Sequence, residues 1–262
     1  MSRKILIFIF ISLFFYTANG ETLKIVGTGS GVSILKKIGK EFTKKNPSIK
    51  IEVPHSIGSG GGIKSVGNEK DILGRVARNL NKGEKLYGLS TVKFARIPIV
   101  IFVNKSVKLN SITSKQFCDI YSGKIRRWEQ INGGKGKIRV IKRENHDSSD
   151  NILKKFVNGY RDIVVTKRSK TTYSDPETIE ECGKKINAIA YGAWPNVKIA
   201  KNIIALKLNG IHPTDKKYYS VGTLSLIFKE KNLAGSVKKF IEFTKTKKAR
   251  RVIIKAGGLP VL

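Results

Sequence analysis

Two glycine-rich turns are the first features of this sequence whose residue types and spacing could do chemistry. Residues 27–31 (GTGSG) and 58–62 (GSGGG) each follow a short apolar run and precede a segment with helical periodicity. A turn between a strand and a helix directs backbone N–H groups and a positive helix end at one place, which favours an anion. The alternative is that both turns serve only as helix entries.

A third polar segment, residues 143–150 (RENHDSSD), also lies between a predicted strand and a predicted helix. Asp147 or Ser148 is a natural N-cap for that helix, which accounts for part of the segment. The cap does not account for Arg143, whose fork of N–H donors suits a tetrahedral oxyanion. Together the three segments indicate an anion-binding site.

Several familiar chemistries are excluded by the same residues. The dinucleotide fingerprint requires a glycine where Val32 stands, and the P-loop requires one where Ile63 stands. Neither Ser30 nor Ser59 lies in a Gly-x-Ser-x-Gly elbow. The chain has two cysteines and three scattered histidines, so we expect no metal, no cofactor and no enzymatic activity.

The elements that must position these segments alternate between strands and helices. Apolar runs predict strands at residues 22–26, 49–53 and 71–74, and helical spacing predicts a helix from Val32 to about Asn46 and another from about Ile63. Strand, glycine turn and helix, twice over, are typical of a parallel α/β sheet. Further strands are predicted at residues 97–103, 138–141, 188–191, 203–206 and 225–228, and further helices at 114–121, 151–156, from 175 onward and 237–254.

The first twenty residues carry the pattern of a signal peptide. Arg3 and Lys4 precede an apolar run over residues 5–15, and the small residues Ala18 and Gly20 follow. We therefore expect cleavage after Gly20 and a periplasmic location. An uncleaved anchor is the alternative, although the run is short for a membrane span of roughly 20 residues.

The composition fits an exported, strongly basic chain. Among 262 residues, 51 Lys and Arg oppose 19 Asp and Glu, a formal charge of +32, or 49 − 19 = +30 without Arg3 and Lys4. The basic residues are spread over every predicted helix and no nucleic-acid motif accompanies them, so we expect no nucleic-acid partner. Cys118 and Cys182 either pair or remain two buried thiols, and the sequence leaves both alternatives open.

In their order along the chain, these motifs resemble those of phosphate-type periplasmic substrate-binding proteins of ABC importers, a type II periplasmic-binding-protein family. The resemblance rests on both glycine turns, on residues 143–149 and on four further segments. These are residues 71–78 (DILGRVAR), 120–128 (IYSGKIRRW), 188–192 (AIAYG) and 256–260 (AGGLP). The series extends over nearly the whole chain beyond residue 20.

That resemblance implies an α/β fold of two lobes joined by crossing strands, with the ligand closed between them. After the signal peptide of residues 1–20, lobe 1 would comprise residues 21–104 and 209–262, and lobe 2 residues 105–208. The ligand contacts would come from all three turns. They are Ser30 with the amides of Gly31 and Val32, Ser59 with Gly60, and Arg143 with Ser148 and Ser149.

Two positions depart from the family's pattern. Arg78, which we also count among the predicted ligand-binding residues, stands where phosphate-specific members often carry an aspartate that accepts a hydrogen bond from protonated phosphate, although an arginine also occurs there in the wider family. We hypothesise that Asp147 has taken over this acceptor role. The alternative is that Asp147 is a helix cap that faces solvent.

The function implied by the resemblance is that of a monomeric receptor, not an enzyme. It would capture inorganic phosphate or a related tetrahedral oxyanion and deliver it to ABC permease subunits in the inner membrane. Three alternatives remain open from the sequence. They are a general receptor for oxyanions such as sulfate or molybdate, a sensory or adhesive protein on the same fold, and an exported phosphatase.

Overall fold

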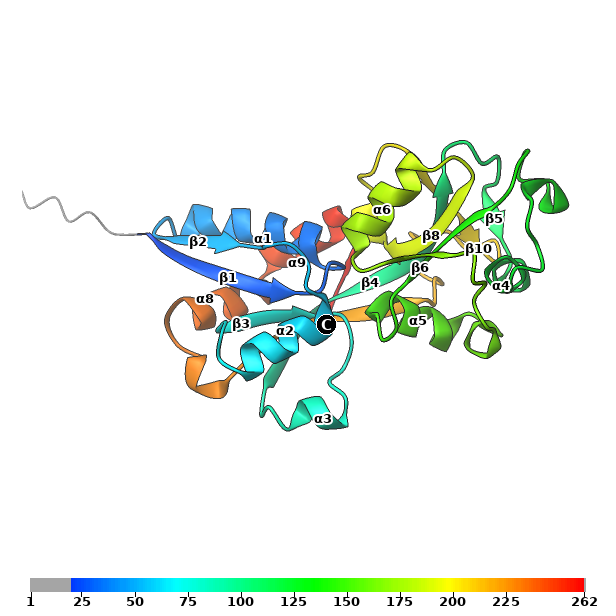
Figure 1. Cartoon of the computed structure of the whole chain (residues 1–262). Helices are drawn as coiled ribbons and strands as arrows, with labels where there is room; N and C mark the ends of the chain where they lie inside the picture. Colours follow the sequence, from blue (N-terminus) through cyan, green and yellow to red (C-terminus); the bar gives the residue numbers. More distant parts are fainter. Residues whose placement is uncertain (1–19, 262) are drawn as a thin grey trace, which may run out of the picture.

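A mixed β-sheet runs through the whole molecule (Figure 1). The computed structural model describes residues 20–261, and the strand order in the sheet is β2-β1-β3-β11-β4-β8-β6-β7. These strands are β1 (Glu21–Gly27), β2 (Ile49–Glu52), β3 (Leu73–Val76), β4 (Ser90–Asn104), β6 (Arg139–Arg143), β7 (Lys170–Thr172), β8 (Ala188–Ala193) and β11 (Val221–Phe228).

The long strand β4 joins two lobes. Its residues from Ser90 to Pro98 pair antiparallel with β11, and those from Ile99 to Val103 pair with β8. Every β4 residue from Ile97 onward is buried, which explains why this part of the strand is a continuous apolar run. We call the group around β2, β1, β3 and β11 lobe 1, and the group around β8, β6 and β7 lobe 2.

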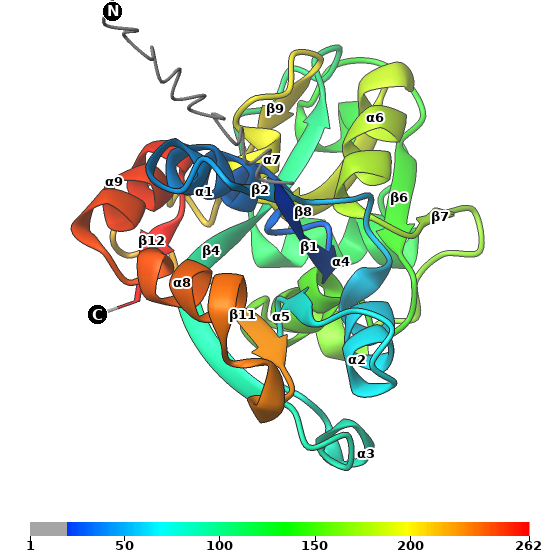
Figure 2. The same ribbon diagram turned by 90° about the vertical axis from the view of Figure 1, so that its left-hand side faces the viewer.

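Lobe 1 is built from parallel strands covered by helices. β1 pairs parallel with β2 and β3, and α1 (Val32–Lys45), α8 (Gly235–Thr244) and α9 (Lys247–Ala256) contact one another on one side of it (Figure 2). Helix α2 (Gly58–Gly67) packs on β3 and β1. The buried face of α1 carries Ile34, Leu35, Ile38 and Phe42, the helical spacing that an amphipathic helix requires.

Lobe 2 surrounds the parallel strands β6 and β8 with α4 (Ser114–Ser122), α5 (Ser148–Phe156), α6 (Asp175–Lys184) and α7 (Trp194–Val197). Its core holds a cluster of tilted and edge-on rings, Phe117, Tyr121, Tyr160 and Tyr191. The remaining elements are short: α3 (Lys82–Lys85), β5 (Ser111–Ile112), β9 (Ile203–Ala205), β10 (Lys207–Leu208), β12 (Leu259–Pro260) and 3-10 turns at Trp128–Ile131, Tyr160–Asp162 and Glu230–Asn232.

The predicted two-lobed α/β fold is confirmed, while several predicted elements need correction. The single helix expected over residues 237–254 is wrong, because α8 ends at Thr244 and the Thr246 side chain caps a new helix by accepting from the N–H of Ala249 at 3.2 Å. The helix expected from Ile63 begins at Gly58, so the second glycine turn is itself the first turn of α2.

Two strands also differ from the prediction. The strand expected at residues 71–74 lies at Leu73–Val76, and the one expected at residues 97–103 begins earlier, at Ser90. The start of β4 alternates between half-buried and exposed residues and includes Lys93 and Arg96, so it lacks the apolar run that identified its second half.

The two cysteines are buried and unpaired, Cys118 in α4 and Cys182 in α6, which agrees with the alternative of two thiols. Apart from Gly20, the predicted signal peptide lies outside the described residues. Between residues 20 and 261, no helix combines the length and the apolar character that crossing a membrane requires.

Candidate anion-binding site

Four helix N-termini meet where the two lobes face each other. Ser59 at the start of α2 lies against Ser148 at the start of α5, with their Oγ atoms 2.9 Å apart. Gly29, just before α1, lies against Asp175 and Pro176 at the start of α6. In Figure 1, β1 ends at this place between α2 and α5. Because each N-terminus carries a partial positive charge, their convergence favours an anion.

The first glycine turn leaves its helix without a side-chain cap. β1 ends at Gly27, whose φ of +129° and close approach to the carbonyl oxygen of Arg75 exclude a side chain. The N-cap of α1 is Gly31, which has no side chain to cap the helix, and the N–H of Val32 donates to the carbonyl oxygen of Gly29 at 3.2 Å. Ser30 is 3% exposed, and its N–H donates to Thr28 Oγ1 at 3.3 Å.

The second turn is held by Ser59. Its hydroxyl oxygen accepts from the N–H of Ala77 at 3.1 Å, which ties α2 to the end of β3. The N-cap of α2, Ile57, makes no side-chain hydrogen bond, and the first N–H of the helix, that of Gly58, donates to Ser56 Oγ at 3.2 Å. Gly62 lies so close to Gly27 that a Cβ would meet the Gly27 Cα at 2.8 Å. The glycines therefore allow the two turns to lie side by side.

Arg78 lies beside this turn but is committed to another partner. A Cβ on Gly60 would lie 3.8 Å from Arg78 Nη2. Both terminal nitrogens of Arg78 donate to the Glu84 carboxylate, at 2.6 and 2.7 Å, and this hydrogen bonding lowers the pKa of Glu84. The positive charge of Arg78 is thus neutralised by lobe 1 itself.

Arg143 is buried between two carboxylates of lobe 2. Its Nη2 donates to Asp147 at 2.7 Å and its Nη1 donates to Asp175 at 3.0 Å and to Thr178 at 3.1 Å. Burial alone would lower the pKa of Arg143, but Asp147 and Asp175 outweigh it and raise the pKa. The remaining donor, Nε, is buried without a hydrogen-bond partner among residues 20–261.

Asp147 is a helix cap, but a buried one. Its Oδ1 accepts from the N–H groups of Ser149 and Asp150, at 2.9 and 3.1 Å, while Oδ2 accepts from Arg143. The side chain is 10% exposed. Burial and the neighbouring Asp175 raise the pKa of Asp147 to about 6, against the lowering effect of Arg143. These contacts use three of the roughly four acceptor positions of a carboxylate, so one remains.

The two serines that follow Asp147 are held from the lobe 2 core. Tyr160 and Tyr191 both donate their hydroxyl hydrogens to Asp150 Oδ1, at 3.0 and 2.7 Å, and thereby anchor the first turn of α5. Ser148 is 3% exposed and Ser149 is fully buried. Within the described part of the chain the Ser149 hydroxyl has no hydrogen-bond partner.

Sequence reasoning missed the contribution of α6 and α7. Asp175 accepts from the N–H of Ala193 at 3.1 Å besides pairing with Arg143, and Asn196 donates across the lobes to the carbonyl oxygen of Gly29 at 3.0 Å. The only signal for Asp175 was its place before Pro176 at a helix start, which also fits an ordinary first turn. Nothing in the sequence pattern indicated Asn196.

The structure therefore brings most of the predicted residues to one place. Ser30, Ser59, Arg143, Ser148 and Ser149 are all buried at the junction of the lobes, beside the N-termini of α1 and α2. Asp147 joins them through Arg143, whereas the Arg78 guanidinium is turned to Glu84. No cluster of His, Cys, Asp and Glu suited to a metal ion occurs within residues 20–261.

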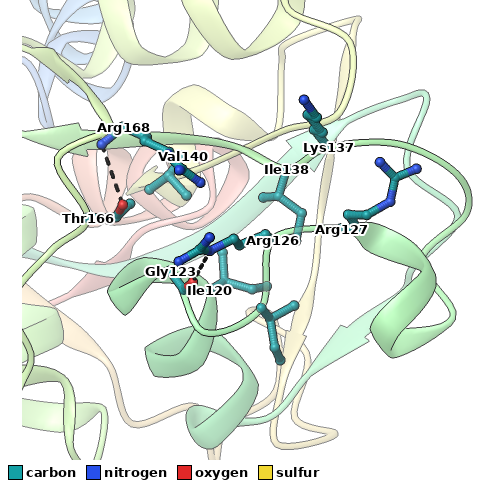
Figure 3. Close-up of a pocket in the computed structure, with 10 residues that line it drawn as sticks. Ile120, Gly123, Arg126, Arg127, Lys137, Ile138, Val140, Thr166 and Arg168 are labelled. Atoms are coloured by element: carbon teal, nitrogen blue, oxygen red, sulfur yellow. Dashed lines mark hydrogen bonds between the residues drawn. The ribbon is translucent and has the colours of Figure 1, made fainter.

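A separate cavity of about 580 Å³ lies on lobe 2, away from these residues (Figure 3). Apolar side chains such as Ile120 and Val140 line it together with exposed cations, and Arg126 donates to the carbonyl oxygen of Gly123 at 2.8 Å. It contains none of the convergent helix N-termini. The lobe junction is closed by the contact of Ser59 with Ser148, which explains why the larger open space lies elsewhere.

Comparison with known proteins identifies the family. The chain matches the PBP superfamily domain over residues 16–247. This chain belongs to the PBP superfamily. Among curated members, the phosphate-binding protein PstS 2 of Streptococcus agalactiae is 31% identical over 118 residues, which is 44% of this chain and 40% of that protein. The phosphate-binding protein PstS of Bacillus subtilis is 23% identical over 94% of this chain and 84% of its own length.

Solved PBP structures agree with the fold. A putative phosphate ABC transporter substrate-binding protein from Clostridium perfringens, determined with bound phosphate, is 26% identical, with a TM-score of 0.82 over 92% of this chain and 100% of that one. An ABC-type phosphate transport receptor from Vibrio cholerae, 21% identical with a TM-score of 0.65, shares the fold. The family resemblance seen in the sequence is confirmed.

Proposed function

We propose that this PBP superfamily member binds inorganic phosphate between its lobes and delivers it to the permease of an ABC importer. The observation that carries the proposal is a pair of buried donors that have no partner among residues 20–261, Arg143 Nε–H and Ser149 O–H, close to the N-termini of α1 and α2. Buried donors normally find an acceptor, and a tetrahedral oxyanion supplies several. The bound phosphate of the Clostridium perfringens relative supports the choice of ligand.

The contacts that we assign to the anion come from both lobes. Lobe 1 would contribute Ser30, the amides of Gly31 and Val32, and Ser59 with Gly60. Lobe 2 would contribute Arg143, Ser148 and Ser149, with Asp147 as acceptor. Because both lobes take part, release of the ligand requires the lobes to separate.

The remaining parts of the proposal concern boundaries and location. The lobes would comprise residues 21–104 with 209–262 and residues 105–208, with the change of partner along β4 at Pro98 and Ile99 lying near the hinge. We further propose a periplasmic, monomeric receptor without enzymatic activity. The relatives support only the receptor part of this proposal, since they are phosphate-binding proteins and one is a transport receptor.

Calorimetric titration of the ligand-free chain with phosphate and with sulfate tests the function. We expect tight phosphate binding with one site per chain and much weaker sulfate binding. Equal affinities for phosphate and sulfate would mean that the protein is a general oxyanion receptor and is not specific for phosphate. If neither anion binds, the proposed function is wrong although the fold stands.

A further inference from the structure

Arg75, on β3, is a fully buried arginine that donates only to backbone carbonyl groups. Its Nε donates to the carbonyl oxygen of Thr28 at 2.7 Å and its Nη2 to that of Pro54 at 2.9 Å, while Nη1 donates to that of Ile25. One guanidinium therefore holds the end of β1, the first glycine turn and the segment that leads into α2.

The charge of Arg75 has no protein counter-charge nearby. Throughout residues 20–261, no carboxylate lies within 4.0 Å of it, whereas Arg78 pairs with Glu84, and Arg143 with Asp147 and Asp175. Burial lowers the pKa of Arg75 to about 10, so the side chain stays protonated at neutral pH. A buried cation without a counter-charge destabilises the folded state, so we expect Arg75 to have a role that offsets this destabilisation.

The position of Arg75 indicates that this role is to orient the first glycine turn. The carbonyl group of Thr28 and the N–H group of Gly29 belong to the same peptide unit, so a donor on the oxygen orients and polarises this N–H toward the lobe junction. The backbone of Arg75 adds a second tie, because its carbonyl oxygen accepts from the N–H of Thr28 at 3.1 Å. Arg75 thus lies behind the turn, with the proposed anion site on its other side.

We propose that Arg75 is a positioning residue that makes the site prefer doubly charged over singly charged oxyanions. The inference rests on the proposed function. Arg143 with Asp147 and Asp175 carries a net negative charge, and Arg78 is neutralised, so Arg75 provides the uncompensated positive charge next to the site. Its attraction grows in proportion to the charge of the ligand, while its hydrogen bonds fix the turn for any ligand.

The test compares phosphate affinity at about pH 6.5 and about pH 8.5, where the ligand passes from mainly singly to mainly doubly charged. Asp147 stays mostly ionised at both values because its pKa is about 6. The variants are Arg75→Met, Arg75→Lys and the control Arg126→Met, which removes the same charge from an exposed position in lobe 2. Thermal unfolding of each variant is recorded alongside.

We expect Arg75→Met to weaken binding by at least about tenfold at the higher pH, and several-fold less at the lower one, as a unit charge on the order of 10 Å away implies. Arg75→Lys should recover much of the pH difference, and Arg126→Met should leave both affinities unchanged. Should Arg75→Met not fold, Arg75→Gln, which keeps a donor for Thr28 without the charge, takes its place.

Equal losses at the two pH values, or a lysine variant no better than the uncharged one, would overturn the assignment and leave Arg75 a structural residue. Failure of the wild-type chain to bind phosphate would contradict the proposed function instead. The two failures are therefore distinct.

Discussion

The two lobes present their donors to the proposed anion in opposite ways. In lobe 1, Gly31 leaves α1 without a side-chain cap, Ser56 accepts from the first N–H of α2, and the turn before α1 is held by Arg75 through carbonyl groups. In lobe 2, the side chains of Asp147 and Ser174 cap α5 and α6, and Arg143 is clamped between carboxylates. Lobe 1 thus offers amides and lobe 2 a network of charged side chains.

The two lobes also differ in how their charged groups respond to pH. Lobe 1 carries a charge that does not titrate near neutral pH, since the pKa of Arg75 is about 10. Lobe 2 carries a group that does titrate, because the pKa of Asp147 is about 6. The comparison predicts that the attraction contributed by lobe 1 stays constant near neutral pH, whereas the selectivity contributed by lobe 2 changes with pH.

Replacing Arg143 should have the largest effect. Arg143→Met removes a proposed ligand donor and leaves Asp147 and Asp175 as buried carboxylates without their partner, a change that costs about 3–5 kcal/mol of stability in comparable sites. We expect phosphate affinity to fall more than about a hundredfold by calorimetry, and unfolding to need less urea. Arg139→Met, an exposed position on the same strand, is the control and should bind normally. Normal binding by Arg143→Met would remove lobe 2 from the site.

Replacing Ser59, on the lobe 1 side, should lower phosphate affinity less than replacing Arg143. Ser59→Ala leaves the N–H of Ala77 without its acceptor and removes the contact with Ser148 across the lobes. Losses of this kind cost about 1–3 kcal/mol, so we expect phosphate affinity to fall about tenfold. Ser148→Ala removes the same cross-lobe contact but spares Ala77, and should cost less. A larger loss of phosphate affinity for Ser148→Ala than for Ser59→Ala would mean that the lobe 2 serine contributes more to binding than the lobe 1 serine.

Sulfate binding at two pH values tests the discriminating role of Asp147, because sulfate keeps its charge throughout. Above a pH of about 6 the ionised carboxylate of Asp147 repels sulfate, and below it the protonated group can donate to sulfate. We expect sulfate affinity to rise several-fold from about pH 7.5 to about pH 5 in the wild type, and phosphate selectivity to narrow. Asp147→Asn should bind sulfate equally at both values. Phosphate-over-sulfate selectivity that is unchanged in this variant would contradict the acceptor hypothesis.

Arg78 should show the smallest effect. Its guanidinium is neutralised by Glu84, and a partly exposed ion pair of this kind is worth about 0–1 kcal/mol. We expect Arg78→Met to change phosphate affinity less than about threefold. A loss above about tenfold would show that Arg78 leaves Glu84 to contact the ligand, and would return it to the site that the sequence suggested.

The residues that the sequence could predict are those that lie next to a helix start. Ser30 lies just before α1, and Ser59 and Ser148 lie in the first turns of α2 and α5, so a local pattern of strand, turn and helix places them at a sheet edge. Arg75 and Asn196 could not be predicted in this way. Arg75 acts through β1, a strand distant in sequence that becomes its neighbour only in the parallel sheet, and Asn196 reaches Gly29 only when the lobes meet.

The division of one predicted helix into α8 and α9 was missed for a different, local reason. Apolar spacing continues across Thr246, and only the cap that its side chain makes to Ala249 marks the new start. The apolar spacing in the sequence therefore predicted which face of the segment is buried, whereas the point where the helix divides depends on one side-chain hydrogen bond.

A crystal structure of the chain with phosphate tests the central claim most directly. We predict one phosphate between the lobes, within hydrogen-bond distance of Arg143 Nε, the Ser149 hydroxyl and the first amides of α1. Phosphate seated instead in the lobe 2 cavity beside Arg126 and Arg168, with the lobe junction empty, would contradict the account.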